Sequence, residues 1–199
     1  DTKNSEILED IEREALADNV PIIRREMQSF LKVLLMVKKP MRVLEVGTAV
    51  GFSALLMSEY VPEECAITTI ENYEKRIPIA RQNFVRAGKE KKITLLEGDA
   101  MDVLKTLEGP YDFIFMDAAK GQYIHYLPEI LRLLAKGGIL VSDNVMQDGD
   151  VIESRFAVER RDRTIHARMR EYLYELKHND ALVTSIIPLG DGVALSVKR

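Results

Sequence analysis

Three side chains in the second half of the chain are of the kinds that bind a hard divalent cation. Asp117 ends one apolar run, and Asp143 with Asn144 ends the next. If the two runs are neighbouring parallel strands, the three side chains converge where ligands bind in such sheets. Two carboxylates and an amide oxygen suit Mg²⁺, Mn²⁺ or Ca²⁺ rather than zinc, and about three of six positions remain for water and substrate. Each aspartate alone would more often cap a helix, but the combination favours a metal site.

A turn with two glycines follows an earlier strand-like run, in Val46-Gly47-Thr48-Ala49-Val50-Gly51. Gly47 lets the backbone turn sharply and approach a ligand, and Gly51 permits close packing where the next helix begins. The spacing is Gly-x-x-x-Gly, so the dinucleotide fingerprint and the phosphate-binding loop are both absent. By itself such a turn is as often a requirement of the fold as a ligand site.

Positions at other strand and helix ends indicate which ligand the turn holds. Glu71 ends the second strand-like run, 20 residues after Gly51, where a carboxylate accepts both hydroxyls of a ribose. Ser53 stands at a helix start, where free backbone donors hold a carboxylate. Asp99 and Ala100 follow the third run and could bracket an adenine ring, although Asp99 also suits a helix N-cap. These sites without a pyrophosphate cradle suit S-adenosylmethionine better than NAD.

Lys120 lies three residues after Asp117, beside the predicted metal site. Its amine could take a proton from a substrate hydroxyl, which a nearby cation makes more acidic. The resulting oxyanion would attack the methyl group of the cofactor in line, with most of the rate gain from positioning and charge stabilisation. A surface lysine without a catalytic part is the alternative. The location favours Lys120 as the base and Asp117 as its catalytic partner.

The elements that must position these residues follow from hydrophobic periodicity. Apolar, β-branched runs alternate with helical patterns, which implies right-handed crossovers and a parallel sheet covered on both faces. The turn Leu189–Gly192 joins the last two runs without a helix, so these form an antiparallel hairpin. We therefore predict an α/β, doubly wound, Rossmann-like fold with seven mostly parallel strands, the variant expected of class I methyltransferases. The predicted strands are Arg42–Val46, Ala66–Glu71, Lys92–Leu96, Tyr111–Asp117, Gly138–Asp143, Leu182–Pro188 and Val193–Val197, and the predicted helical segments are Ser5–Val37, Phe52–Tyr60, Glu74–Ala87, Met101–Leu107, Tyr123–Ala135 and Arg160–His178.

Length and composition indicate one globular domain. The chain has 199 residues, of which 46% are hydrophobic and 30% charged, and it contains no repeat or linker. We expect a single methyltransferase domain over 1–199, with an N-terminal helical cap at 1–40 and a Rossmann-like core at 41–199.

Charge, cysteine content and hydropathy indicate the protein's surroundings. The net charge of -4 does not indicate nucleic-acid binding by the molecule as a whole. The single cysteine, Cys65, cannot form an internal disulfide, which fits a reducing compartment, and is expected as a small side chain near a strand start. The densest apolar run, Phe30–Val37, is too short for a membrane span and predicts a buried helix. No signal peptide is recognised, so we expect a cytoplasmic protein without membrane association.

Several of these segments together resemble a known family. They are Leu44–Ser53, Glu71, Gly98–Ala100, Asp117–Gly121 and Asp143–Val145. They look like the corresponding segments of the cation-dependent, catechol-type O-methyltransferases, which use S-adenosylmethionine. The resemblance runs from about Val20 to the C-terminus, and the combination of segments is highly specific.

The resemblance implies a role for each matching position. The family's metal ligands match Asp117, Asp143 and Asn144, and its catalytic base matches Lys120. The family is commonly dimeric, so a homodimer is expected. The positions that match cofactor contacts are Val20, Glu45, Gly47, Thr48, Ser53, Glu71, Asp99, Ala100 and Asp117.

Within the family, some stretches look closer to the bacterial tRNA 5-hydroxyuridine methyltransferases, which make 5-methoxyuridine at the wobble position. Among them are Val20–Ile22, Asp117–Tyr123 and Ile187–Gly192. The 5-hydroxyl and 4-carbonyl of that base are adjacent oxygens that could chelate Mg²⁺ as a catechol does. An arginine-dense segment suits the phosphates and unpaired bases of a tRNA anticodon loop, although a solvated helix with acidic partners fits equally well. Its arginines are Arg155, Arg160, Arg161, Arg163, Arg168 and Arg170.

Two other functions stay open beside tRNA modification. Methylation of a small catechol, caffeoyl or flavonoid compound requires the same catalytic residues. A module that binds S-adenosylmethionine without catalysis is the third, and the complete set of metal ligands and base argues against it. His125, His166 and His178 lack ligand spacing and are expected to be surface or incidental residues. Tyr123 and Tyr126 either flank the substrate or pack in the core.

Overall fold

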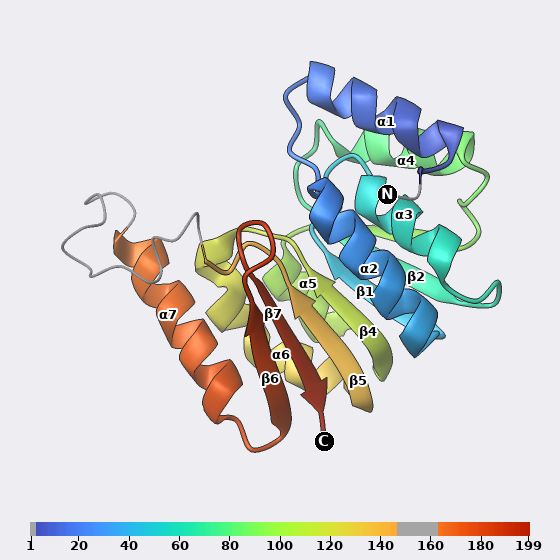
Figure 1. Cartoon of the computed structure of the whole chain (residues 1–199). Coiled ribbons are helices and arrows are strands. Elements are labelled where there is room, and N and C mark those ends of the chain that lie inside the picture. Colours follow the sequence, from blue (N-terminus) through green and yellow to red (C-terminus); the bar gives the residue numbers. More distant parts are fainter. Residues whose placement is uncertain (1–2, 147–162) are drawn as a thin grey trace. The chain divides into compact units, whose positions relative to one another are not determined.

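The computed structural model of this chain describes residues 3–146 and 163–199 (Figure 1). Residue contacts group the chain into two compact units, Asp1–Val103 and Leu104–Arg199, which are described separately below. The division into a cap at 1–40 and a core at 41–199 of one domain stays a prediction. Among the described residues, no helix is both long and apolar enough to cross a membrane.

The first unit is built on three parallel strands. β1 (Arg42–Val46) pairs with β2 (Ala66–Glu71), and β2 pairs with β3 (Ile93–Glu97). The register aligns Val46 with Ile70, so the carboxyl ends of neighbouring strands lie at one edge. The first two strands have their predicted bounds, and the third is shifted by one residue. This edge is where the sequence places the cofactor residues.

Helices of the first unit are α1 (Glu6–Ala17), α2 (Arg25–Lys38), α3 (Phe52–Tyr60) and α4 (Ile77–Arg86). Both α1 and α2 pack against α3. The crossovers through α3 and α4 run in the same direction across the sheet, so right-handedness puts both helices on one face. The helical region predicted at Ser5–Val37 is two helices, separated by a segment that contains Pro21, which cannot donate a helical hydrogen bond.

The apolar run Phe30–Val37 is only partly buried, so the prediction of a buried helix is wrong here. Leu31 is fully buried, whereas Val33, Met36 and Val37 are 60%, 60% and 79% exposed. A helix turns by about 100° per residue, so a continuous apolar run must present some side chains away from the unit it packs on. Helix α2 therefore has an outward apolar face.

The second unit has four strands in the order β4-β5-β7-β6. β4 (Tyr111–Met116) and β5 (Leu134–Ser142) are parallel, and β6 (Leu182–Ile187) and β7 (Val193–Lys198) form an antiparallel hairpin whose second strand pairs with β5. The closing hairpin is thus confirmed. The described residues contain seven strands that are mostly parallel, in the predicted α/β class.

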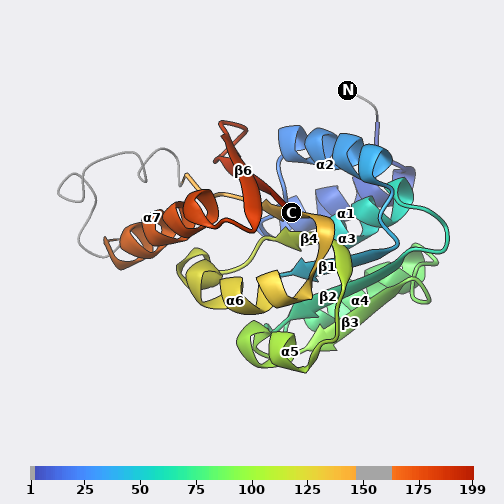
Figure 2. The same cartoon turned by 90° about the horizontal axis from the view of Figure 1, so that it is seen from below.

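Helices of the second part of the chain are α5 (Ala100–Thr106), which crosses the boundary between the units, the short 3₁₀ helix η1 (Lys120–Gln122), α6 (Tyr123–Leu133) and α7 (Arg163–His178). In the second unit, α6 packs against β4, and α7 packs against α6, η1 and β6. Figure 2 shows α6 and α7 as neighbours below the strands of this unit.

The histidines divide between surface and interior. His125 and His178 are exposed, as predicted. His166 is 2% exposed, so of the two expected alternatives, a surface or an incidental residue, the surface position does not hold for it. It lies on the same face of α7 as Met169 and Tyr172, because residues three and six positions apart share a helix face. Cys65 is buried just before β2, as expected.

Candidate active site

The turn after β1 has a shape that depends on its glycines. Gly47 and Gly51 have φ angles of +93° and +87°, which glycine adopts at little cost. A Cβ on Gly51 would lie 2.5 Å from the ring of Phe84 in α4, so the close packing predicted at this glycine is confirmed. The Gly47 amide donates to the carbonyl of Ile70 (3.0 Å), which joins the turn to the end of β2.

Glu71, the last residue of β2, stabilises the turn after β1 through hydrogen bonds. One carboxylate oxygen accepts the amide of Ala49 (2.8 Å), and the other accepts the amides of Asn72 (3.0 Å) and Tyr73 (2.8 Å). Ala49 itself has φ +49°, a left-handed conformation that a non-glycine residue rarely adopts. An ionised carboxylate has about four acceptor sites, so Glu71 keeps acceptor capacity at the turn.

Glu45 is a fully buried carboxyl group at the end of β1. Burial raises its pKa, and hydrogen bonding from Ser53 and Thr69 opposes that rise. The Thr69 hydroxyl donates to Oε2 at 2.5 Å. Thr48 also lowers this pKa as a neighbouring hydroxyl, although neither Oε1 of Glu45 nor the Thr48 hydroxyl makes a hydrogen bond of ordinary geometry. Because buried polar atoms are nearly always satisfied, a polar ligand or water at this glycine turn would complete their hydrogen bonding.

The start of α5 lies next to the same strand ends. The Gly98 amide donates to the carbonyl of Glu71 (3.0 Å), which places the following residues at the end of β2. Asp99 accepts the amide of Met101 (2.8 Å), so its N-cap role is confirmed. Ala100, the first residue of α5, is 9% exposed. A small side chain here leaves the backbone accessible to a flat ligand.

Ser53 and Val20 are the predicted cofactor residues in the helical part of the first unit. Ser53 is 7% exposed in the first turn of α3. Val20 is half-buried between α1 and α2, and its amide donates to the carbonyl of Ala15 (2.8 Å). The structure therefore brings the turn, Glu45, Ser53, Glu71 and the start of α5 to one edge, while the cofactor contact of Val20 stays a prediction.

Both predicted metal-binding aspartates lie at the same end of adjacent strands in the second unit. Asp117 directly follows β4, and Asp143 directly follows β5. The last residues of these strands, Met116 and Ser142, are paired in register, and the Asp143 amide donates to the Met116 carbonyl (3.0 Å). Asp143 is 5% exposed and Asp117 is half-buried. Two carboxylates at the same end of neighbouring strands are placed as two ligands of one cation would need to be.

The hydroxyl of Tyr123 lies between the two aspartate segments. It is 3.0 Å from the Met116 carbonyl and 3.2 Å from the Asp143 carbonyl, and it accepts the amide of Ala118 (3.3 Å). Burial raises its pKa well above the usual value, and the negative charges of Asp117 and Asp143 raise it further. The side chain is fully buried, which supports core packing over the alternative of flanking a substrate.

Tyr172 supports Tyr123 from α7. The two rings meet edge to face, with centroids 5.5 Å apart. The Tyr172 hydroxyl is 2.6 Å from the Ser142 hydroxyl, one residue before Asp143. Burial also raises the pKa of Tyr172, so both phenols stay protonated at neutral pH. Two buried tyrosines therefore contact the ends of β4 and β5, next to the aspartates.

The third predicted ligand, Asn144, is held by the hairpin loop between β6 and β7. Its φ is +56°, and its side-chain amide donates to Oδ2 of Asp191 (3.3 Å). The backbone amides of the next two residues, Val145 and Met146, donate to this loop as well. Because the nitrogen of Asn144 faces Asp191, its oxygen is the atom available to a cation. Sequence reasoning missed Asp191, since its turn signalled only a hairpin.

The described residues contain no cluster of three or more His, Cys, Asp or Glu side chains that could hold a metal ion. A cation at Asp117 and Asp143 therefore requires a different third ligand, and the amide oxygen of Asn144 is of the hard type that Mg²⁺ and Ca²⁺ accept. The donor set fits a divalent oxygen-binding cation, with Asn144 completing it.

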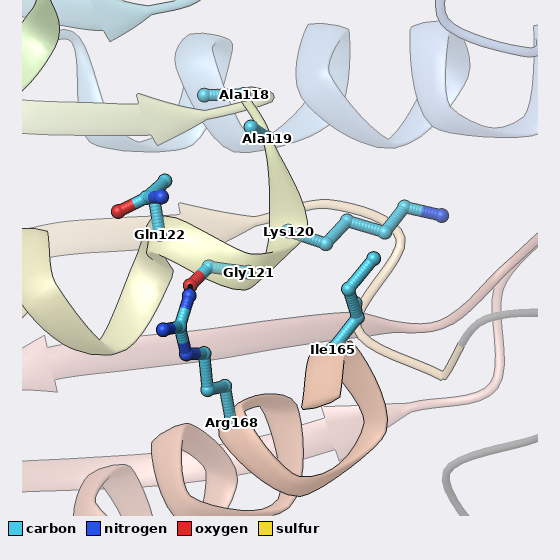
Figure 3. A pocket seen from close by; sticks show the side chains of 7 residues that line it. All are labelled: Ala118, Ala119, Lys120, Gly121, Gln122, Ile165 and Arg168. Carbon is cyan, nitrogen blue, oxygen red and sulfur yellow. Dashed lines mark hydrogen bonds between the residues drawn. The ribbon is translucent and has the colours of Figure 1, made fainter. Parts of the chain in front are cut away.

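Lys120 lies beside a pocket of about 510 Å³ in the second unit. The pocket is lined by the turn after Asp117 and by two residues of α7, namely Ala118, Ala119, Lys120, Gly121, Gln122, Ile165 and Arg168. Figure 3 shows the guanidinium of Arg168 at Gly121, with the Lys120 side chain extending away from it. The volume is within the usual range for small-molecule sites. A candidate base thus borders a cavity that could hold the acceptor.

Part of the arginine-dense segment lies outside the described residues. Arg155, Arg160 and Arg161 belong to that part. Arg163, Arg168 and Arg170 lie on α7, and of these Arg168 lines the pocket.

This chain is similar to O-methyltransferases of known sequence and structure. Residues 1–199 match the family model described as O-methyltransferase. A catechol O-methyltransferase of Niastella koreensis is 35% identical over 128 residues, which are 62% of this chain and 58% of that relative, so the match spans less than two thirds of its length. Caffeoyl-CoA O-methyltransferase 2 of Populus trichocarpa is 33% identical over 183 residues, 83% of this chain and 70% of that protein. The solved SAH-bound methyltransferase PaMTH1 of Podospora anserina has a TM-score of 0.89 and 28% identity, covering 98% of this chain and 89% of its own.

Proposed function

Since this chain belongs to the O-methyltransferase family, we propose that it transfers a methyl group from S-adenosylmethionine to a substrate hydroxyl beside a bound divalent cation. The observation that supports this most is the position of Asp117 and Asp143 at the same end of two paired strands. Lys120 follows Asp117 by three residues.

We expect S-adenosylmethionine at the glycine turn, where it supplies the electrophilic methyl group. Oε1 of Glu45 and the Thr48 hydroxyl would gain a polar partner from the ligand. Glu71 would accept from the ribose hydroxyls, and Asp99 and Ala100 would border the adenine. The SAH-bound Podospora anserina relative supports a ligand of this kind.

Asp117, Asp143 and Asn144 would hold the cation, with Mg²⁺ preferred and Mn²⁺ or Ca²⁺ as substitutes. Bound there, the cation lowers the pKa of a nearby substrate hydroxyl. Lys120 accepts the hydroxyl proton at its amine, and the walls of its pocket orient the acceptor. Tyr123 would position the two aspartates through the backbone carbonyls of Met116 and Asp143, and Asp191 would position Asn144 through its side-chain amide.

The substrate that we propose is 5-hydroxyuridine at the wobble position of tRNA. Support comes from the resemblance of Asp117–Tyr123 and Ile187–Gly192 to that branch and from the arginines of α7. Small catechol-like acceptors are the second candidate, favoured by the names of the relatives from Niastella koreensis and Populus trichocarpa. Mass spectrometry of tRNA nucleosides from a strain lacking the gene separates them, because 5-hydroxyuridine accumulates only in the first case.

The reaction type is tested with the purified chain, labelled S-adenosylmethionine, and either catechol or an anticodon stem-loop containing 5-hydroxyuridine. EDTA should abolish label transfer, and excess Mg²⁺ should restore it. Asp143→Asn keeps the size of the side chain while removing its charge, and should lower transfer at subsaturating Mg²⁺. Full transfer in EDTA would contradict the role of the cation.

We also propose a homodimer. The outward apolar face of α2, with Val33, Met36 and Val37, is the kind of surface that a second copy would cover. Light scattering of the chain and of Val37→Glu gives the test, since the charge should shift the mass toward the monomer. An unchanged mass near that of one chain for both proteins would contradict the dimer.

A further inference from the structure

We propose that Arg168 binds a phosphate group of the acceptor, so that the pocket beside Lys120 selects a nucleotide over an uncharged nucleoside or catechol. This inference rests on the proposed methyl transfer and goes further, because it assigns a substrate class and a recognition residue to the pocket. Its basis is the position of Arg168, the charge of the pocket lining and the volume of the pocket.

Arg168 is held at the pocket by a contact between elements far apart in the sequence. Its Nη1 donates to the carbonyl of Gly121 at 3.2 Å, across a separation of 47 residues. The side chain is half-buried, and it starts from the second turn of α7. One hydrogen bond uses one of the five guanidinium N–H donors, so the planar group keeps a fork that can meet a phosphate.

Gly121 takes part in this contact through its backbone carbonyl, and the space beside it would also admit a Cβ. A Cβ at Gly121 would lie 3.8 Å from Nη1 of Arg168 and 3.7 Å from Ile165, which is ordinary contact with side chains on α7. The turn of η1 and the start of α7 thus pack without a bulky side chain between them. Arg168 is consequently positioned by the scaffold and loses less side-chain freedom when it binds an anion.

The charge of the lining favours an anion. Arg168 carries a permanent positive charge, and no acidic side chain lines the pocket among the residues that the structure describes. The other side chains of the lining are mainly apolar, with Ile165 from α7 and Ala118 and Ala119 from the turn. An apolar wall with the guanidinium of Arg168 at one side and the proposed base Lys120 at the other suits a flat base that carries a phosphate close to it.

The volume of the pocket helps to decide whether the bound phosphate belongs to a nucleotide or to a coenzyme A thioester. In a nucleotide, one sugar separates the base from its phosphate, so both fit a cavity of about 510 Å³ that Lys120 and Arg168 share. In a coenzyme A thioester, the long pantetheine arm puts the phosphates far from the methyl acceptor. The shared cavity therefore favours a nucleotide, as found in an RNA chain.

The test compares acceptors with and without phosphate. Methyl transfer is measured with 5-hydroxyuridine, its 3′,5′-bisphosphate, catechol and caffeoyl-CoA, for the original chain and for Arg168→Gln. We expect KM for the bisphosphate to rise about tenfold to a hundredfold, as for loss of a charged hydrogen bond, with kcat little changed. The values for 5-hydroxyuridine and catechol should stay the same. Arg168→Lys should recover part of the loss, and Lys177→Gln, which removes an exposed cation in the last turn of α7, should leave KM unchanged.

A binding measurement keeps the inference testable without turnover. Uridine 3′,5′-bisphosphate and uridine are titrated into the chain and into Arg168→Gln by calorimetry, with thermal unfolding as a check on folding. Weaker binding of the bisphosphate alone supports the role of Arg168, whatever the reaction. Equal losses for both ligands, or no loss, would overturn it. An Arg168 effect confined to caffeoyl-CoA would overturn the nucleotide assignment, and failure of all four acceptors to be methylated would refute the proposed function instead.

Discussion

Removal of one hydroxyl, in Tyr123→Phe, tests how the candidate metal centre is held. The hydroxyl accepts the Ala118 amide and donates its one proton toward the carbonyls of Met116 and Asp143. The ring remains, so its edge-to-face contact with Tyr172 is kept. The substitution therefore isolates the polar contacts that join the two strand ends.

The cost can be worked out from these contacts. Two hydrogen bonds are lost, at about 1 kcal/mol each, and a buried backbone group left unsatisfied adds about 1 to 2 kcal/mol. We expect the free energy of unfolding to fall by about 3 to 4 kcal/mol, which lowers Tm by roughly 6 to 16 °C for a chain of this size. Because the same hydroxyl contacts the backbone on both sides of Asp117 and the carbonyl of Asp143, affinity for Mn²⁺ should fall by about tenfold or more, which corresponds to at least 1.4 kcal/mol.

Urea unfolding measures the first effect, and electron paramagnetic resonance of free Mn²⁺ measures the second at a temperature where the variant is folded. Tyr172→Phe is the matched control, since it removes a buried hydroxyl that contacts the Ser142 side chain rather than the backbone beside Asp117. It should lose stability with a smaller change in Mn²⁺ affinity. If Tyr123→Phe unfolds like the original chain and binds Mn²⁺ equally well, the reasoning about this hydroxyl is wrong.

Three further substitutions test other parts of the site. Asp191→Ala releases the side-chain nitrogen of Asn144, and should weaken Mn²⁺ binding about threefold to thirtyfold while S-adenosylmethionine affinity in calorimetry stays the same; equal Mn²⁺ affinity would exclude this positioning role. Glu45→Gln removes a carboxyl group whose pKa is raised above 4.5 in the folded state. The original chain should therefore be most stable relative to the variant below pH 4.5. This difference in the free energy of unfolding should decline as the pH rises through the folded-state pKa. Unfolding titrations from pH 4 to 8 show the trend, and a difference that grows with pH would contradict it. Gly51→Ala adds a Cβ 2.5 Å from Phe84 at φ +87°, and should cost about 2 to 4 kcal/mol in unfolding experiments, with a near-zero change as the refuting result.

The sequence determined the order of elements and the residues that could do chemistry. Alternating apolar and helical patterns predicted all seven strands, because each period is a local property of the chain. The aspartates at the ends of consecutive strands could be paired from the sequence alone, since parallel neighbours end at the same edge. The close packing of Gly51 followed in the same way from its place at a helix start.

Only the tertiary structure decided which side chains meet across long stretches of chain. Asp191 reaches Asn144 and Arg168 reaches Gly121, each over 47 residues, and the hydroxyl of Tyr123 lies between two strand ends. It also showed that His166 is buried, on the α7 face that bears Met169 and Tyr172, where the helical spacing of these apolar residues was the signal that could have predicted it. Such contacts depend on how several packed elements are placed together, and the periodicity of any one segment holds no information about the surface it will meet.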